Sequence, residues 1–201
     1  MANNLELNKG DQFIFALDVS RSMGMTDCPG GLSRIEFSKE QAKVFASEAG
    51  KYDPDGADYF TFGHSVKSYL NQTPEEAIKL ISSLQANEGS TDTAGVIRAA
   101  WERAKELRAN GVTDNIVLMV ITDGEPNDRE AVKVVIREIA ETLTNGEEFG
   151  ISFLTVGNID SGLQSFLTEL DDTLNAKHDI VDVKDFMSVD FATAFDGAVH
   201  D

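Results

Sequence analysis

The stretch Phe13-Ile14-Phe15-Ala16-Leu17 leads directly into Asp18-Val19-Ser20-Arg21-Ser22. An uninterrupted apolar run that contains aromatic and β-branched residues is typical of a strand buried on both faces of a parallel sheet. Two similar runs follow at residues 116–121 and 151–156, each bounded by polar or glycine positions. The chain therefore predicts an α/β protein whose central strands are covered by helices on both sides.

Weaker strand patterns complete the sheet. Residues 58–62 and 66–70 flank the short connection Gly63-His64-Ser65, which predicts an antiparallel hairpin at a sheet edge. Residues 178–183 are a sixth candidate strand, and this places His178 in a strand.

Helical patterns fill the segments between these strands. Ser33 to Glu36 and Thr73 to Glu76 both read as capping boxes at helix starts. Apolar residues at helical spacing predict further helices around residues 94–104, 132–143, 163–170 and 187–198, the last beginning near Met187. The alternation of strands and helices predicts a doubly wound, mostly parallel six-stranded sheet. We expect one domain at residues 11–200 after an N-terminal tail at residues 1–10.

The net charge of the chain limits the classes of partner that we expect. Lys and Arg number 17 and Asp and Glu 35, which gives a net charge of −18. Such a surface repels phosphate backbones and anionic lipids, so we expect no nucleic-acid and no membrane partner. It also favours a soluble monomer. Cys28 is the single cysteine, and no signal peptide or membrane-spanning apolar run is evident, so a cytoplasmic protein is expected.

Polar residues follow the apolar runs at points that the predicted topology brings together. Asp18, Ser20 and Ser22 follow the first run, and Asp123 follows the run at residues 116–121. Thr91 lies in the loop before the helix predicted at residues 94–104. In an open α/β sheet, sites form beyond the carboxyl ends of the strands, so these residues should converge.

This ordered set, D-x-S-x-S, then Thr, then Thr-Asp-Gly at residues 122–124, resembles the von Willebrand factor A (VWA) family. The resemblance covers roughly residues 10–200 and implies a mostly parallel six-stranded sheet with one antiparallel edge strand. It also implies a metal-ion-dependent adhesion site, in which Ser20, Ser22 and Thr91 bind the ion through hydroxyls. Asp18 and Asp123 would act directly or through water.

The implied ligands are all hard oxygens, which suit Mg²⁺ or Mn²⁺, with Ca²⁺ as an alternative, and argue against Zn²⁺. Neutral hydroxyls leave the ion electrophilic enough to take one more anionic oxygen. Each short string alone is also typical of a turn or a helix cap.

Several neighbouring residues allow two interpretations. Asp27, in the loop at residues 23–32, could add a carboxylate near the ion, although the family pattern does not require one. Glu125 could be a further acid beside the metal, and Asp128 a cap of the next helix. His64, His178 and His200 lack metal-ligand spacing.

The resemblance implies a binding module rather than an enzyme. A partner protein would present an Asp or Glu carboxylate to the ion. Small bacterial proteins with stand-alone VWA domains are similar to this chain, which suggests an adaptor in an AAA+ ATPase or stress-response system. One alternative is a Mg²⁺-dependent phosphotransferase of the haloacid-dehalogenase type, but Ser20 stands where that chemistry needs a second Asp. Another is a scaffold with an unoccupied metal site.

Overall fold

The computed structural model describes residues 10–53, 55–123 and 125–200. Within these residues, six strands form one sheet in the order β3-β2-β1-β4-β5-β6. All neighbours pair in parallel except β2 and β3, which form the expected antiparallel hairpin at the edge. The strands are β1 (Gln12–Asp18), β2 (Ala57–Phe62), β3 (Val66–Gln72), β4 (Ile116–Thr122), β5 (Phe149–Thr155) and β6 (Val181–Asp185).

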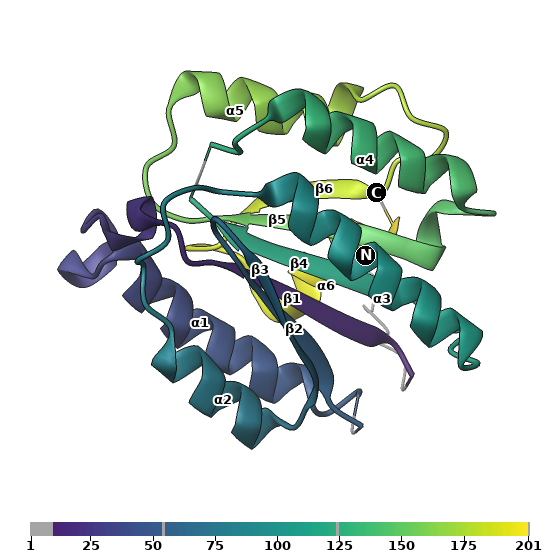
Figure 1. Cartoon of the computed structure of the whole chain (residues 1–201), viewed down its shortest axis with the longest axis horizontal. Coiled ribbons are helices and arrows are strands. Elements are labelled where there is room, and N and C mark those ends of the chain that lie inside the picture. Colours follow the sequence, from purple (N-terminus) through teal and green to yellow (C-terminus); the bar gives the residue numbers. More distant parts are fainter. Residues whose placement is uncertain (1–9, 54, 124, 201) are drawn as a thin grey trace, which may run out of the picture.

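Helices cover both faces of this sheet (Figure 1). One face carries α1 (Arg34–Ala49), α2 (Pro74–Ser83) and α6 (Phe191–His200). The other carries α3 (Thr93–Ala109), α4 (Arg129–Thr142) and α5 (Ser161–Thr168). Short 3₁₀ turns occupy Arg21–Gly24, Pro29–Gly31 and Gly146–Glu148, and a π turn occupies Glu169–Thr173. The doubly wound fold predicted from the sequence is confirmed.

The continuous apolar runs follow from this double cover. Along β1, Phe13, Phe15 and Leu17 pack into the core beneath α1, α2 and α6. Ile14 and Ala16 point the other way, into the core beneath α3, α4 and α5. Alternate side chains of a strand face opposite sides of a sheet, so a strand with two buried faces needs apolar residues at every position.

Both predicted capping boxes are present. The N–H of Ser33 donates to Glu36 Oε2 at 3.0 Å, and the N–H of Glu36 donates to Ser33 Oγ at 3.3 Å. Thr73 and Glu76 repeat the arrangement at the same two distances. Each box satisfies backbone donors that the first turn of a helix leaves unpaired.

Two boundaries predicted from the sequence are wrong. The strand predicted at residues 178–183 begins only at Val181, where pairing with Ile151 starts, so His178 lies in a bend before it. Met187 lies in a turn after β6 rather than in a helix. Asp190 is the reason, because its carboxylate accepts the N–H of Thr193 at 2.8 Å and starts α6 at the next residue.

Across the described part of the chain, no helix combines the length and the apolar character that crossing a membrane requires.

Candidate metal centre

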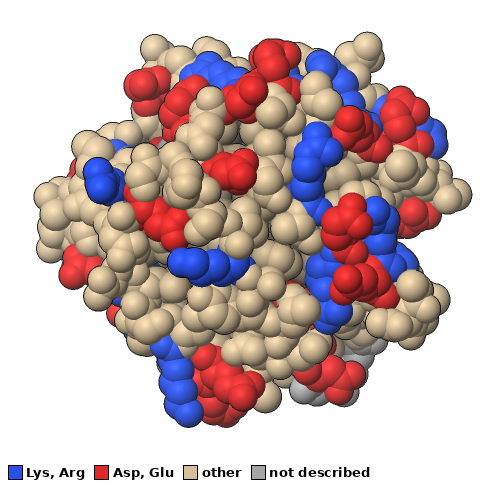
Figure 2. Space-filling model, viewed as in Figure 1, with Lys and Arg blue, Asp and Glu red and all other residues tan. Residues whose placement is uncertain are grey.

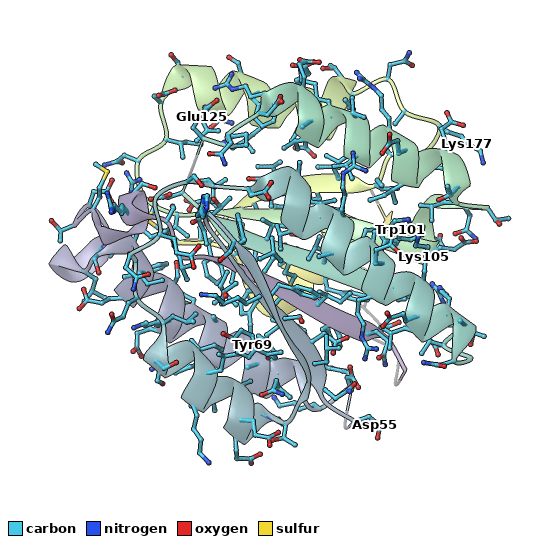
Figure 3. All side chains as sticks on the ribbon, in the orientation of Figure 1. Asp55, Tyr69, Trp101, Lys105, Glu125 and Lys177 are labelled. Atoms are coloured by element: carbon cyan, nitrogen blue, oxygen red, sulfur yellow. The ribbon has the colours of Figure 1, made fainter. Side chains whose placement is uncertain are left out.

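The predicted site lies where β1 and β4 end. The two strands are neighbours, with Leu17 opposite Ile121, so Asp18 and Asp123 emerge at the same edge of the sheet. Figure 3 shows Glu125, which follows β4, on this side of the molecule, and Asp55 at the opposite end. Adjacency of the two central strands therefore brings together residues that lie more than a hundred positions apart.

Asp18 is fully buried and organises the start of the site. Its Oδ1 accepts the N–H of Ser20 at 2.8 Å, and its Oδ2 accepts the hydroxyl of Thr122 at 2.6 Å. Burial nevertheless raises the pKa of Asp18 to about 6, because the charged form has lost its water. A cation beside Asp18 would stabilise that charged form.

Ser20, Ser22 and Asp123 form a continuous row of oxygens, which we call the hydroxyl row. The hydroxyls of Ser20 and Ser22 lie 3.0 Å apart, and the Ser22 hydroxyl donates to Asp123 Oδ1 at 2.9 Å. Ser20 and Asp123 are both buried. The D-x-S-x-S turn and the end of β4 are thus joined by side chains as well as by the sheet.

Thr91 reaches the same edge through backbone contacts. The loop before α3 runs beside the motif, with Glu88 in a parallel bridge to Ser20. The N–H of Thr91 donates to Asn127 Oδ1 at 3.0 Å, and the N–H of Asn127 donates to the Thr91 carbonyl at 3.0 Å. Thr91 is buried between the β1 and β4 loops, and the role of Asn127 in holding it was not predicted.

Arg34 is a member of this site that the sequence analysis missed. It is the first residue of α1 and only 5% exposed. Its Nη1 donates to Asp123 Oδ2 at 2.8 Å. Its Nε and Nη2 donate to the two oxygens of Asp27 at 2.8 and 2.6 Å. In the sequence, Arg34 simply follows the predicted helix cap Ser33, and nothing near it indicates a contact with the site.

The Arg34 contact decides between the two interpretations of Asp27. Both carboxylate oxygens of Asp27 accept bonds from Arg34, and this holds the pKa of Asp27 down at about 2. The carboxylate is therefore committed to a guanidinium instead of standing open beside the ion. Glu125 likewise pairs with Arg129. Asp128 caps α4 by accepting the N–H of Ala131, as predicted.

The donors present fit a divalent cation. Among the described residues, no group of three or more His, Cys, Asp or Glu side chains could hold a metal, so an ion here has to use hydroxyls. The hydroxyl row and Asp18 provide hard oxygens of the kind that Mg²⁺ and Mn²⁺ prefer. Gly124, the last residue of the Thr-Asp-Gly string, lies outside the described residues.

Known proteins share this fold. A variant of an aerotolerance-related membrane protein from Bacteroides fragilis NCTC 9343, with multiple mutations to serines, is 17% identical with a TM-score of 0.61, over 94% of this chain and 96% of that chain. The SpRpn10 VWA domain is 13% identical with a TM-score of 0.63, over 92% of this chain and 93% of that chain. The manganese-loaded TRAP protein of Plasmodium vivax is 12% identical with a TM-score of 0.61, over 94% and 73%.

At these identities the likeness shows the fold alone. No curated protein matches the chain significantly. The family model of the von Willebrand factor type A domain, however, matches residues 13–194, which include every residue of the candidate site. The chain therefore belongs to the von Willebrand factor type A domain family.

Proposed function

We propose that this chain is a metal-dependent protein-binding module. Asp18, Ser20, Ser22, Thr91 and Asp123 hold a divalent cation, Mg²⁺ or Mn²⁺, whose open position takes an Asp or Glu carboxylate of a partner protein. The observation that carries the proposal is the hydroxyl row at the shared edge of β1 and β4. Membership of a family whose domains are often protein-interaction modules supports it.

The charge balance of the site favours an anionic partner group. Two carboxylates offset the charge of a divalent ion, while the remaining donors are neutral hydroxyls. Such an ion keeps more attraction for an outside carboxylate than one enclosed by four acids. Asp18 is buried and bound to the backbone, so it acts as a fixed negative charge beneath the ion.

Calorimetric titration with Mg²⁺ and Mn²⁺ after EDTA treatment tests the metal site. We expect one-site binding in the parent chain and its loss in Asp18→Asn, because the substitution keeps the shape of the side chain and removes its charge. Asp53→Asn is the matched control, since Asp53 is equally buried but lies before β2, at the opposite end of the sheet. Binding that survives in Asp18→Asn would refute the assignment.

The open coordination position has its own test. With Mn²⁺ bound, water in the first coordination sphere enhances the relaxation of bulk water protons. Glutarate should displace this water and lower the enhancement, whereas glutaramide, which has the same size but no charge, should not. Equal effects of the two compounds would contradict a carboxylate-binding ion.

The proposal extends to the setting of the protein. We place it in the cytoplasm as a monomeric adaptor, in an assembly such as an AAA+ ATPase or stress-response system. Partner capture from a cell extract should be abolished by EDTA and by Asp18→Asn. The module carries out no catalysis, so hydrolysis of p-nitrophenyl phosphate at a rate that depends on Mg²⁺ and on Asp18 would overturn this part.

A further inference from the structure

One guanidinium joins three loops at the carboxyl edge of the sheet. Arg34 binds Asp123 after β4 and Asp27 in the loop after β1. Its Nη2 also donates to the carbonyl of Asn158, which follows β5, at 3.3 Å. The N–H of Asn158 in turn donates to Asp27 Oδ2 at 3.1 Å. We call Arg34, Asp27, Asp123 and Asn158 the Arg34 network.

The network leaves Asp123 little freedom. One carboxylate oxygen accepts Nη1 of Arg34, and the other accepts the hydroxyl of Ser22. The planar fork of Arg34 is itself fixed by the paired bonds to Asp27, because two parallel N–H donors define an orientation as well as a distance. The direction of the Ser22 hydroxyl therefore depends on a side chain at the start of α1.

The backbone after β5 is shaped around this guanidinium. Gly157 has a φ of +78°, and a Cβ added there would lie 2.3 Å from Nε of Arg34. A residue with a side chain would both strain the backbone and displace the guanidinium. The close approach at Gly157 thus supports a fixed position for Arg34.

We propose that Arg34 is a positioning residue of the metal site. Its guanidinium fixes Asp123, and Asp123 in turn holds the hydrogen of the Ser22 hydroxyl, which would leave the lone pairs of that hydroxyl free for an ion. This inference rests on the proposed function, because it concerns the ion that the site would hold.

Asp27 completes the device by balancing charge. A lone cation beside a divalent ion would weaken binding of that ion by direct repulsion. The Arg34–Asp27 pair is close to neutral, so Asp18 and Asp123 remain to balance the ion. The loop at residues 23–32 thereby contributes to metal affinity through a carboxylate that does not touch the metal.

Substitution of Arg34 by lysine separates geometry from charge. Arg34→Lys keeps the positive charge, but one ammonium cannot bridge Asp27 and Asp123 as the fork does. We expect the dissociation constants of Mg²⁺ and Mn²⁺, measured by calorimetry, to rise about tenfold, the scale typical of groups that orient metal ligands. The electron paramagnetic resonance spectrum of bound Mn²⁺ should also change.

Arg103→Lys is the matched control. Arg103 donates from Nε to Asp58 Oδ2 at 2.6 Å and from Nη2 to Asn71 Oδ1 at 2.9 Å. This similar, partly buried arrangement lies near the start of β2, away from the site. Arg103→Lys and Arg34→Lys should both lower the thermal midpoint. Arg103→Lys should leave the Mn²⁺ spectrum and both dissociation constants unchanged. A merely structural role of Arg34 predicts the same unchanged values for Arg34→Lys.

Asp27→Asn is the second variant, and it decides the matter if Arg34→Lys does not fold. It should raise the dissociation constant of Mn²⁺ about tenfold, the lower end of the range typical of groups that orient metal ligands. If Arg34→Lys folds and binds Mn²⁺ as tightly as the parent chain, the positioning role is overturned and the proposed function stays intact. The same holds for Asp27→Asn if it is the only variant of the two that folds. A parent chain that binds neither ion would overturn both.

Discussion

At the scale of single residues, buried carboxylates at the two ends of the sheet differ in their hydrogen-bond partners. At one end, Asp123 accepts a bond from Arg34. Asp53, before β2 at the other, is 2% exposed, and its Oδ2 has no hydrogen-bond partner among the described residues. Burial, with the nearby charges of Asp55 and Asp58, raises the pKa of Asp53 to about 6. The ionised form of Asp53 is therefore a cost to the folded state.

This cost predicts a pH-dependent gain in Asp53→Asn. Below about pH 3, Asp53 is protonated in both the folded and the unfolded chain, and the substitution should be neutral. As pH rises to about 6, the folded state holds the proton longer than the unfolded state, so the parent loses stability. Above pH 6, Asp53→Asn should exceed the parent by about 1 to 3 kcal/mol.

Urea unfolding at pH 4 and pH 7.5 measures this difference. Asp55→Asn, which removes a neighbouring charge from a less buried residue, is a useful comparison and should give a smaller gain at pH 7.5. A gain in Asp53→Asn that is equal at both pH values would contradict titration of Asp53 as its cause.

Residues of the site were predictable to the extent that strand ends fix them. Asp18, Ser20 and Asp123 follow long apolar runs, and parallel strands bring such positions to one edge. Arg34 gave no comparable signal, because its partner Asp123 lies 89 positions away and no periodicity links the two. Pairing of side chains from different loops depends on tertiary contacts that a local pattern does not contain.

At the scale of elements, the capping hydrogen bonds at helix starts were predictable. The outcome where a helix cap and the spacing of apolar residues indicate different helix starts was not. Both capping boxes start helices where the sequence placed them. The helix predicted from Met187 begins instead at Phe191, because Asp190 caps it and Asp185 holds Met187 in a turn. Apolar spacing continued through that turn by coincidence, so a cap overrode the periodic pattern.

Packing of α6 on the sheet gives a prediction for one glycine. Figure 1 shows α6 against the sheet, and it contacts β5. A Cβ at Gly150 of β5 would lie 1.8 Å from the carbonyl oxygen of Ala198 in α6. Because this obstacle is backbone, Gly150→Ala should push the helix away and lower the free energy of unfolding by about 2 to 3 kcal/mol.

Gly89→Ala is the control for this substitution, because a Cβ there meets no atom within 4 Å. It should change the free energy of unfolding by less than about 0.5 kcal/mol. Hydrogen exchange should show faster exchange of α6 amides in Gly150→Ala alone. Unchanged protection of α6 together with full stability would contradict the close helix–strand approach.

At the scale of the whole molecule, a sheet between two cores supports a candidate site built from loops. Two cores lie on either side of the sheet and contain most of the apolar side chains. The candidate site is built from loops at one edge, where the strands have already fixed the backbone. Exposed positions of such loops can change with little effect on the cores, whereas Val19, Met23 and Cys28 of the loop after β1 are themselves part of one core.

The net charge of −18 acts on the entire chain and gives the last prediction. On the face in Figure 2, acidic and basic side chains are interspersed. Close ion pairs of the described residues include that of Lys51 Nζ with Glu48 Oε1 at 2.6 Å. Salt screens charge–charge interactions over distances longer than the Debye length, which is about 8 Å at 0.15 M. Ion pairs in contact at about 3 Å are screened much less. Raising salt should therefore remove net repulsion while sparing most local pairs.

We accordingly expect the thermal midpoint in EDTA to rise between 10 and 300 mM NaCl. A gain of about 1 kcal/mol corresponds to about 2 to 4 °C for a chain of this length. Choline chloride should give the same rise as NaCl, since screening does not depend on the identity of the cation. A rise in NaCl alone would point to specific Na⁺ binding, and a fall in both salts would mean that attractive surface pairs outweigh the repulsion of an acidic chain.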